Sequence, residues 1–178
     1  MSDDDREASP AKPKRKRAPL WVCVARVLAV FVVLTGILKV TGWGDRLFFY
    51  PVRSEYEPPV WAEDVWFESG GRRLHGWFYP ARRPAPEDGS TLGPAPTIVH
   101  CHGNAFNISR HADFVDFLPA AGFNVFIFDY RSYGMSDKGP LNRDGLIDDA
   151  GAALDYVFSR DDIDPERVGA CGLSLGGT

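Results

Sequence analysis

Several features that would assign this chain to a common protein class are missing or scarce. Three cysteines among 178 residues are too few for a disulfide framework. Basic residues form no long stripe beyond the N-terminus and the net charge is −4, so we expect no nucleic acid partner. The apolar fraction of 44% is ordinary for a folded domain, which argues against disorder and against a collagen-like repeat. We also expect no metal and no cofactor, and the length fits one domain of moderate size.

The cysteines are interpreted as packing residues rather than as reactive groups. Cys23 lies in an apolar segment, and Cys101 and Cys171 lie in expected strands. Because buried thiols behave as small hydrophobic groups, a redox pair between Cys101 and Cys171 is not favoured.

Long apolar runs are also scarce, and the one exception lies near the N-terminus. Residues 1–18 are polar, acidic first and then basic, and we expect a disordered tail there. Residues 20–38 are almost wholly apolar and match the ~20 residues that a helix needs to cross a bilayer. Arg26 lies near the basic end, where its side chain can reach the headgroups. Trp21 and Trp43 bracket the run as interfacial aromatic residues do.

Three interpretations of residues 20–38 compete: a signal anchor, a cleaved signal peptide and a buried core helix. No small-x-small cleavage site follows the run, and the basic cluster before it argues against a core helix. The sequence therefore favours a transmembrane anchor at residues 19–43. The basic cluster predicts a cytoplasmic N-terminus and places the rest of the chain on the opposite face, periplasmic or extracytoplasmic in a bacterium.

The remaining pattern predicts a connector followed by an α/β domain. Residues 44–60 form the connector, whose aromatic cluster at residues 47–51 either packs on the domain or lies at the membrane surface. Residues 61–178 form the domain. It begins with an antiparallel hairpin (63–68 and 73–79) and a Pro-rich loop (81–96), and continues with strand 97–102, helix 109–120, strand 123–128, helix 142–159 and strand 167–171. Such alternation predicts a mostly parallel sheet with helices on its faces.

The two expected helices carry apolar residues at helical spacing. We expect the first to face the core with Phe114, Val115 and Leu118. We expect the second to do so with Leu146, Ile147, Ala150, Leu154, Val157 and Phe158.

Polar residues with chemical potential follow three of the expected strands. His102-Gly103-Asn104 follows one, Asp129 the next and Ser174 the last. Because ligands of such sheets bind beyond the carboxyl ends of the strands, these three loops should open onto one crevice.

The last strand runs into Gly172-Leu173-Ser174-Leu175-Gly176, the spacing of a nucleophile elbow. A serine that attacks a carbonyl must stand clear of the sheet on a tight strand-to-helix turn. Such a turn strains the backbone at Ser174 and leaves no room for side chains at Gly172 and Gly176. The spacing alone also occurs by chance in glycine-rich chains.

With these residues in series, the chain resembles the first part of an α/β-hydrolase. The matching segments are His102-Gly103-Asn104-Ala105, residues 129–136 and residues 172–177. The resemblance is strongest to the membrane-anchored group of monoacylglycerol lipases, lysophospholipases, depalmitoylating thioesterases and the serine aminopeptidase-like domain. Phe106 and Ser132 depart from it, since relatives often carry glycine at both positions, and we expect a narrower crevice.

The resemblance implies a serine hydrolase that acts on a small-molecule or lipid acyl substrate. Ser174 would be the nucleophile, and backbone N–H groups of Leu175 and of Asn104 or Ala105 would hold the oxyanion. His102 would brace the oxyanion turn rather than act as the base, and Asp129 and Arg131 would tie loops together by a hydrogen bond or ion pair. Gly103, Gly172 and Gly176 would support the site.

The acid and the histidine of a catalytic triad are missing from the chain. All four histidines precede Ser174, and no acidic residue follows it, whereas both triad partners follow the serine in this fold. We therefore expect the N-terminal part of a hydrolase, truncated after the elbow, inactive and poorly soluble by itself. The alternative is a non-catalytic, membrane-tethered protein that keeps half a hydrolase fold for binding or structure. The oligomeric state stays open.

Overall fold

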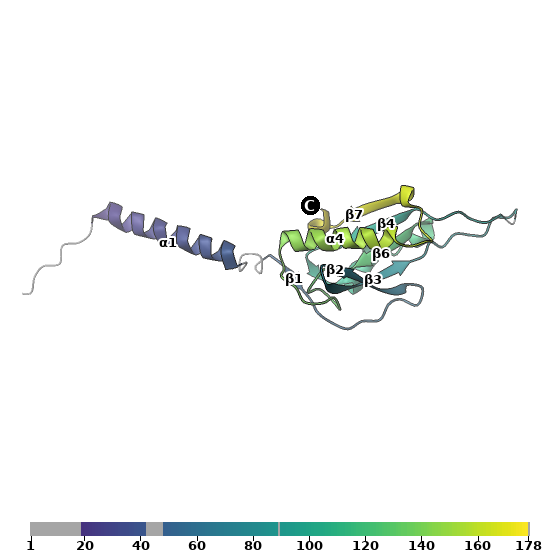
Figure 1. Ribbon diagram of the computed structural model, residues 1–178, viewed down its shortest axis with the longest axis horizontal. Coiled ribbons are helices and arrows are strands. Elements are labelled where there is room, and N and C mark those ends of the chain that lie inside the picture. The colour runs from purple at the N-terminus through teal and green to yellow at the C-terminus, as the bar shows by residue number, and fades with distance from the viewer. Residues whose placement is uncertain (1–18, 42–47, 89, 178) are drawn as a thin grey trace, which may run out of the picture. The chain divides into compact units, whose positions relative to one another are not determined.

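The computed structural model describes residues 19–41, 48–88 and 90–177, in two compact units, Met1–Thr41 and Gly42–Thr178. The expected disordered tail, Trp43 and Leu47 lie outside the described residues. The first unit contains one continuous helix, α1 (Leu20–Thr41) (Figure 1). Residues 20–38 have a mean hydropathy of 2.4, so α1 is long and apolar enough to cross a membrane. Length and composition alone fit a signal sequence or a core helix as well.

The second unit is built on a five-stranded mixed sheet in the order β2-β3-β6-β4-β7. Its strands are β2 (Glu63–Ser69), β3 (Arg72–Tyr79), β4 (Thr97–Cys101), β6 (Asn124–Phe128) and β7 (Val168–Gly172). β2, β3 and β6 pair antiparallel, whereas β4 pairs parallel with both β6 and β7. The carboxyl ends of the three parallel strands therefore lie at one edge of the sheet, as the strand order in the sequence predicts.

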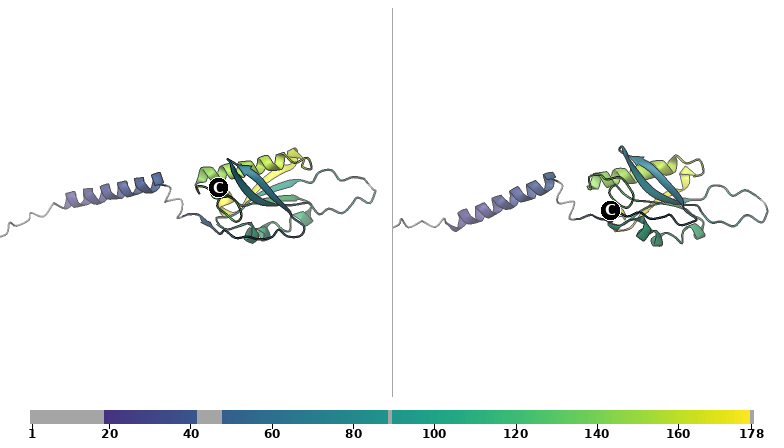
Figure 2. Two further views of the ribbon diagram at one scale, coloured as in Figure 1. Left: turned by 60° about the horizontal axis from the view of Figure 1, so that its bottom comes forward. Right: turned by 90° about the horizontal axis from the view of Figure 1, so that it is seen from below.

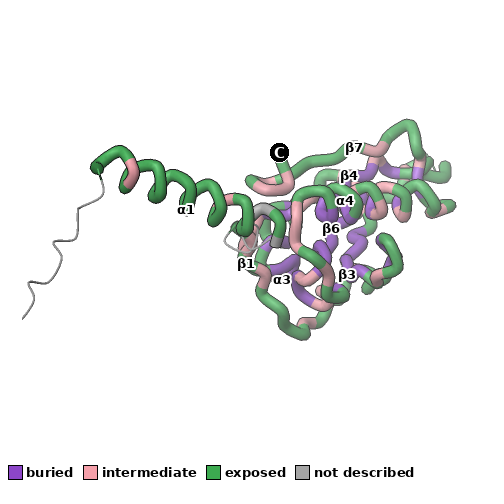
Figure 3. The backbone as a smooth tube through the Cα atoms, turned by 60° about the vertical axis from the view of Figure 1, so that its left-hand side comes forward, coloured by how far each residue is buried: buried purple, intermediate pink, exposed green. Residues whose placement is uncertain are grey.

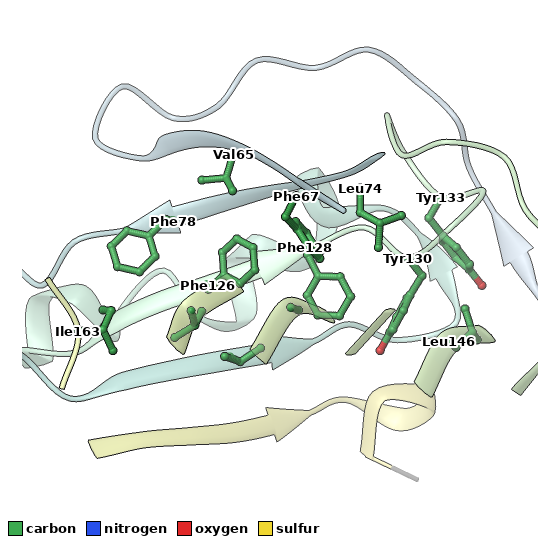
Figure 4. Packing of buried hydrophobic residues seen from close by; sticks show 13 residues of the cluster. Val65, Phe67, Leu74, Phe78, Phe126, Phe128, Tyr130, Tyr133, Leu146 and Ile163 are labelled. Atoms are coloured by element: carbon green, nitrogen blue, oxygen red, sulfur yellow. The ribbon is translucent and has the colours of Figure 1, made fainter. Parts of the chain in front are cut away.

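The strand β6 lies in the middle of the sheet and is buried along its whole length. Its side chains alternate between two cores, since successive residues of a strand point to opposite faces. Phe126 and Phe128 join the core between the sheet and α4 (Arg143–Phe158), which includes Phe78, Leu146 and Val157 (Figure 4). The other face carries a second core, formed by Trp77, Tyr79, Val125 and Ile127 of the sheet and by Ile108, Ala112 and Val115. Figure 2 shows the sheet between these two covering layers.

The segment that covers the second face is not the helix predicted over residues 109–120. It consists of one helical turn, α3 (Ile108–His111), and two 3-10 turns, Ala112–Phe114 and Pro119–Ala121. Pro119 explains the break, because its ring excludes the carbonyl of the residue four positions earlier and it has no N–H to donate. As a result Val115 is buried, but Phe114 is exposed rather than part of the core.

The helix predicted over residues 142–159 is confirmed, with Asn142 and Ser159 as its caps. The side chain of Asn142 accepts from the Gly145 N–H at 2.8 Å. The predicted inward face is only partly right, since Ile147 and Phe158 are exposed. Asp149 and Ala153 take the inward positions together with Leu146 and Val157.

The strand β7 was expected to be buried, but four of its five residues are exposed (Figure 3). Among the described residues it pairs only with β4, so one of its edges is open. Cys171, expected to be a buried thiol, is exposed for the same reason, whereas Cys101 on β4 is half-buried.

The connector after α1 is part of the second unit. β1 (Tyr50–Pro51) pairs parallel with β5 (Ala105–Phe106), and Phe49 packs against the core that faces α4. Phe49 thus packs on the domain, whereas the side chains of Phe48 and Tyr50 are exposed. This pairing places residues 48–52 beside the turn that follows β4.

Candidate active site

Ser174 lies on a sharp corner between β7 and a terminal 3-10 turn, Ser174–Gly177. Its φ of 52° is in the left-handed region, which costs a residue with a side chain on the order of 1–3 kcal/mol. Two backbone hydrogen bonds hold the corner. The Leu173 N–H donates to the carbonyl of Cys101 at 3.0 Å, and the Gly176 N–H donates to the carbonyl of Leu173 at 3.0 Å.

The two glycines that flank Ser174 are required by close backbone contacts. A Cβ on Gly172 would overlap the carbonyl of Gly176, and a Cβ on Gly176 would overlap the carbonyl of Cys101. The corner therefore presses onto the end of β4, as the Gly-x-Ser-x-Gly spacing predicts.

The Ser174 corner borders a cavity of about 690 Å³ at the carboxyl ends of β4 and β7. Such a volume is typical of small-molecule sites, which span roughly 300–1,000 Å³. Apolar and aromatic side chains predominate in its lining, which consists of Phe48, Phe49, Cys101, Asn104, Tyr130, Arg143, Leu146, Ile147, Ala150, Ser174, Leu175 and Gly176.

The turn after β4, residues 102–106, lies against the Ser174 corner. A Cβ on Gly103 would lie 3.5 Å from the carbonyl oxygen of Leu173. Asn104 lines the cavity together with Ser174 and Leu175, whereas Ala105 is absent from its lining and lies in β5, paired with Tyr50. Of the two residues expected to supply the second oxyanion donor, Asn104 is the one that borders the cavity.

Asn104 is held by groups from two distant segments. Its Nδ2 donates to the carbonyl of Phe48, and its Oδ1 accepts from the Tyr50 N–H at 3.3 Å. The hydroxyl of Tyr133 lies 2.7 Å from the backbone oxygen of Asn104 and 3.0 Å from its Oδ1. The connector and the loop after β6 together fix this turn, a role that the sequence did not reveal for Phe48, Tyr50 or Tyr133.

Phe106 and Ser132, which depart from the family pattern at positions where relatives often carry glycine, both have a φ of 68°. The left-handed backbone that glycine favours is therefore kept with a side chain present. At Ser132 the cost is offset by hydrogen bonds, since its N–H donates to the carbonyl of Asp137 at 2.9 Å and its Oγ donates to the carbonyl of Gly139 at 2.9 Å. The Phe106 side chain is exposed and lies outside the cavity lining, so the lining contains neither residue that was expected to narrow it.

Asp129 is fully buried behind the turn after β4. Its Oδ1 accepts from the Ile108 N–H at 3.0 Å, and its Oδ2 accepts from the Tyr56 hydroxyl. His102 Nε2 lies 3.7 Å from Oδ1, and His75 Nδ1 lies 3.9 Å from Oδ2. Burial raises the pKa of Asp129 to about 8, against the lowering effect of the Ile108 hydrogen bond, so the carboxyl is mostly protonated at neutral pH.

His102 is buried and neutral, because burial lowers its pKa to about 3. Its Nδ1 lies 2.7 Å from the carbonyl oxygen of Gly103, so this nitrogen carries the proton and donates. Neither His102 nor any other described histidine lines the cavity of Ser174. The hydrogen bond to Gly103 lies within the turn that His102 is expected to brace, and the bracing role itself stays a prediction.

Arg131 and Asp129 do not form an ion pair with each other, and Arg131 pairs with Asp149 instead. Its guanidinium and its backbone N–H bind the buried carboxylate of Asp149 on α4, at 2.8 to 3.0 Å. Ser69 Oγ donates to the same carboxylate at 2.7 Å. Arg131 thus joins the loop after β6 to α4 and to the hairpin, while Asp129 joins β6 to Tyr56 and to the start of α3. The sequence analysis did not single out Asp149 as the partner of Arg131, because an acidic residue in a helix is ordinarily exposed.

Comparison with known proteins agrees with this arrangement. No family model matches the chain. YfhR of Escherichia coli K12 is 40% identical over 173 residues, which cover 94% of this chain and 56% of YfhR. The Arabidopsis thaliana protein named "Alpha/beta hydrolase domain-containing protein WAV2" is 34% identical over 160 residues, which cover 82% of this chain and 48% of that protein. An esterase structure from Pyrococcus furiosus superposes with a TM-score of 0.56 at 23% identity, over 71% of this chain and 49% of the esterase.

We assign the chain to the α/β-hydrolase superfamily. Its strand order and its mixed sheet with covering helices are those of an α/β hydrolase. The chain spans about half the length of the curated relatives it matches.

Proposed function

We propose that this chain is the nucleophile-bearing part of a serine hydrolase that cleaves an ester, thioester or amide bond of an acyl substrate. The observation that carries the proposal is the left-handed backbone of Ser174, held on a corner beside the cavity that Asn104 also lines. Strained backbone at a non-glycine residue persists where the surrounding contacts enforce it and is frequent at active sites. A binding module has no need of a serine in such a conformation.

The chemistry assigned to the chain is acyl transfer in two steps. Ser174 Oγ attacks the carbonyl carbon and its proton passes to a base, while the carbonyl π electrons move to the oxygen. The N–H groups of Leu175 and Asn104 stabilise this oxyanion, and one such donor is worth ~3 kcal/mol in the transition state. Collapse of the intermediate releases the alcohol, thiol or amine, which takes the proton. Water then attacks the acyl-enzyme by the same route and releases the acid and Ser174.

None of the described histidines lines the cavity of Ser174, so we place the base elsewhere. Two of them, His100 and His102, also have pKa values lowered by burial to about 4 and about 3, so neither accepts a proton near neutral pH. In the fold that this chain shares, the acid and the histidine follow the serine. The proposal therefore requires both to follow Ser174 in the polypeptide.

A fluorophosphonate probe on the full-length protein tests the assignment. We expect covalent labelling of Ser174, lost in Ser174→Ala, and ester turnover that is lost with it. The second candidate is a catalytically inactive tethered protein, and its support is that no described histidine lines the cavity of Ser174. Absence of Ser174-dependent labelling in folded full-length protein would support that candidate and reject the hydrolase.

We also propose that α1 anchors the hydrolase domain to a membrane, with the N-terminus cytoplasmic and the domain on the opposite face. The support is the length and hydropathy of residues 20–38 and the basic residues before them. Protease added to sealed cells or spheroplasts should digest the domain while the N-terminal tail stays protected. Recovery of the full-length protein in the soluble fraction would reject the anchor.

A further inference from the structure

We infer that Arg143 gives this site a preference for acyl substrates that carry an anionic group, a carboxylate or a phosphate. The inference rests on the proposed function, because it names the substrate class of the same cavity. The substrate would be an amphiphile, with an apolar chain against the cavity wall and an anionic group at Arg143.

Arg143 is the first residue of α4 and lines the cavity with Ser174. It is the one charged residue among the described residues that line this cavity. The polar groups beside it, Asn104 and Ser174, are uncharged and are assigned to the reaction itself. A charged group on a substrate in this cavity would therefore meet a positive charge and no described negative one.

The position of Arg143 is electrostatically unfavourable for the isolated helix. The N-terminal end of a helix carries partial positive charge, so carboxylates are favoured there and cations are disfavoured. Asp144, the next residue, follows that rule, and Arg143 does not. Its charge therefore gives the helix no benefit that would explain its presence.

The guanidinium of Arg143 also has no partner among the residues that the structure describes. The other arginines of the α4 region are paired: Arg131 binds Asp149, and Arg160 binds Glu63 at 2.9 Å and Asp162 at 2.7 Å. Arg143 is exposed, so its donors stay available to a ligand. A guanidinium presents its donors as a planar fork that matches two oxygens of a carboxylate or phosphate.

The apolar residues of the cavity lining favour the apolar chain of the substrate. Phe48, Phe49, Leu146, Ile147 and Ala150 present apolar surface to the cavity. Apolar walls lower the local dielectric constant and so strengthen an ion pair with Arg143 relative to one in bulk water. The anionic group can lie on the acyl part or on the leaving part of the substrate, since both enter the same cavity.

Two pairs of substrates, matched except for charge, test the inference on the full-length protein. For the acyl side the pair is p-nitrophenyl pentanoate and mono-p-nitrophenyl glutarate. For the leaving side it is a monoacylglycerol and its phosphate monoester with the same acyl chain. We expect the ratio of anionic to neutral kcat/KM to fall about tenfold in Arg143→Gln for the pair that fits the site, as for loss of a charge-assisted hydrogen bond.

Four further measurements separate a specific contact from a general charge effect. Arg143→Lys should keep part of the ratio, and Arg143→Glu should raise turnover of a cationic choline ester relative to its neutral counterpart. The control Arg167→Gln removes the same charge at the opposite end of β7, where the guanidinium donates to the carbonyl of Pro94 at 3.2 Å, and should leave both ratios unchanged. In the unmutated protein the ratio should fall as salt is added, because exposed charge pairs are screened.

The outcomes distinguish this inference from the function on which it rests. One outcome would overturn the anion preference alone. In it, the ratios for both substrate pairs are the same in the unmutated protein and in Arg143→Gln, while Ser174-dependent turnover of the neutral esters stays intact. A similar fall of the ratio in Arg167→Gln would do the same. Absence of any Ser174-dependent turnover in the unmutated protein would overturn the proposed function and this inference with it.

Discussion

The hydroxyl of Tyr133 donates to Asn104 at both of its oxygens, 2.7 Å from the backbone carbonyl and 3.0 Å from Oδ1. Tyr133 lies in the loop after β6, and Asn104 lies in the turn after β4, 29 residues apart in the chain. In the proposed reaction the Asn104 N–H, which belongs to the peptide between Gly103 and Asn104, donates to the oxyanion. Tyr133 contacts the following peptide through the Asn104 carbonyl, and also contacts the Asn104 side chain. The position of the donor therefore depends on a tyrosine that does not line the cavity.

Tyr133→Phe should lower kcat about tenfold with little change in KM, since the loss falls on the transition state more than on substrate binding. The free energy of unfolding should fall by ~1 kcal/mol, the net value of one hydrogen bond. Ester kinetics and urea unfolding of the full-length protein measure the two effects. Tyr156→Phe is the control, because that hydroxyl accepts from Arg160, just beyond the end of α4, and does not line the cavity. An equal loss of kcat in both variants would contradict a positioning role for Tyr133.

Ser174→Gly should be more stable than Ser174→Ala by about 1 kcal/mol. A left-handed φ costs a residue with a Cβ ~1–2 kcal/mol, and the greater backbone freedom of glycine in the unfolded state removes part of that gain. Both variants lose the nucleophile and should fail to react with the fluorophosphonate probe. Urea midpoints of the two proteins provide the comparison, and equal midpoints would mean that Ser174 is not strained.

Gly176→Ala should lower the free energy of unfolding by ~1–3 kcal/mol, as for other overpacked sites, and should also abolish probe labelling. The reason is the overlap of the new Cβ with the carbonyl of Cys101, which forces the corner away from β4. Gly151→Ala is the matched control, because outside its chain neighbours and the backbone of its own helix no heavy atom lies within 4 Å of the added Cβ, in the middle of α4. That variant should gain ~0.5–1 kcal/mol, since alanine is the better helix former. Labelling that survives in Gly176→Ala would argue against the tight corner.

Breaking the Arg131–Asp149 pair should cost far more than breaking a surface pair. Asp149→Ala leaves the Arg131 charge without its buried partner, for which a loss of ~3–5 kcal/mol in the free energy of unfolding is typical. Asp162→Ala removes the exposed partner of Arg160, and we expect a loss of at most ~1 kcal/mol. Thermal or urea unfolding of both variants checks the contrast. Similar losses of unfolding free energy in the two variants would contradict a buried Arg131–Asp149 pair.

The buried carboxyl of Asp129 should make the protein less stable as the pH rises. Its folded pKa is about 8, raised by burial, whereas the pKa of an unfolded Asp is ~3.9. Between these values the folded state keeps a proton that the unfolded state has lost, so this group's contribution is full below pH ~4 and is lost by about pH 8. Asp129→Asn cannot titrate, and its stability should vary less with pH in that window.

The buried histidines His75, His100 and His102 act in the opposite direction. His100 and His102 stay neutral down to about pH 4 and pH 3, and burial also lowers the pKa of His75. Their unfolded pKa is ~6.5, so the unfolded state binds more protons on acidification and stability falls below that pH. Urea unfolding as a function of pH separates the two effects, because Asp129→Asn should remove the loss of stability as the pH rises from about 4 to about 8 and leave the loss on acidification. An unchanged loss on raising the pH from about 6.5 to about 8 in that variant would contradict a protonated Asp129.

Local patterns in the sequence were sufficient for the elements with a strong periodic or turn signal. Alternation and the Ser-Gly-Gly turn predicted the β2-β3 hairpin, and Asn142 and Ser159 marked the ends of α4 within one residue. The glycine spacing around Ser174 predicted a corner without room for side chains, since that requirement depends on backbone sterics alone. Helical periodicity failed over residues 109–120, where Pro119 outweighed the apolar spacing.

What the sequence by itself determined is the order of the strands and the local chemistry at their ends: Ser174 on its corner, the turn after His102, and Asp129 after β6. Only the tertiary structure decided which partners these groups meet. Arg131 binds Asp149 rather than Asp129, Tyr133 and Tyr50 hold Asn104, and Arg143 reaches the cavity of Ser174 without a partner among the described residues. The physical reason is that propensity and periodicity act between near neighbours in the chain. These contacts join residues far apart in sequence, and only the packing of α4, the loop after β6 and the connector against the sheet brings them together.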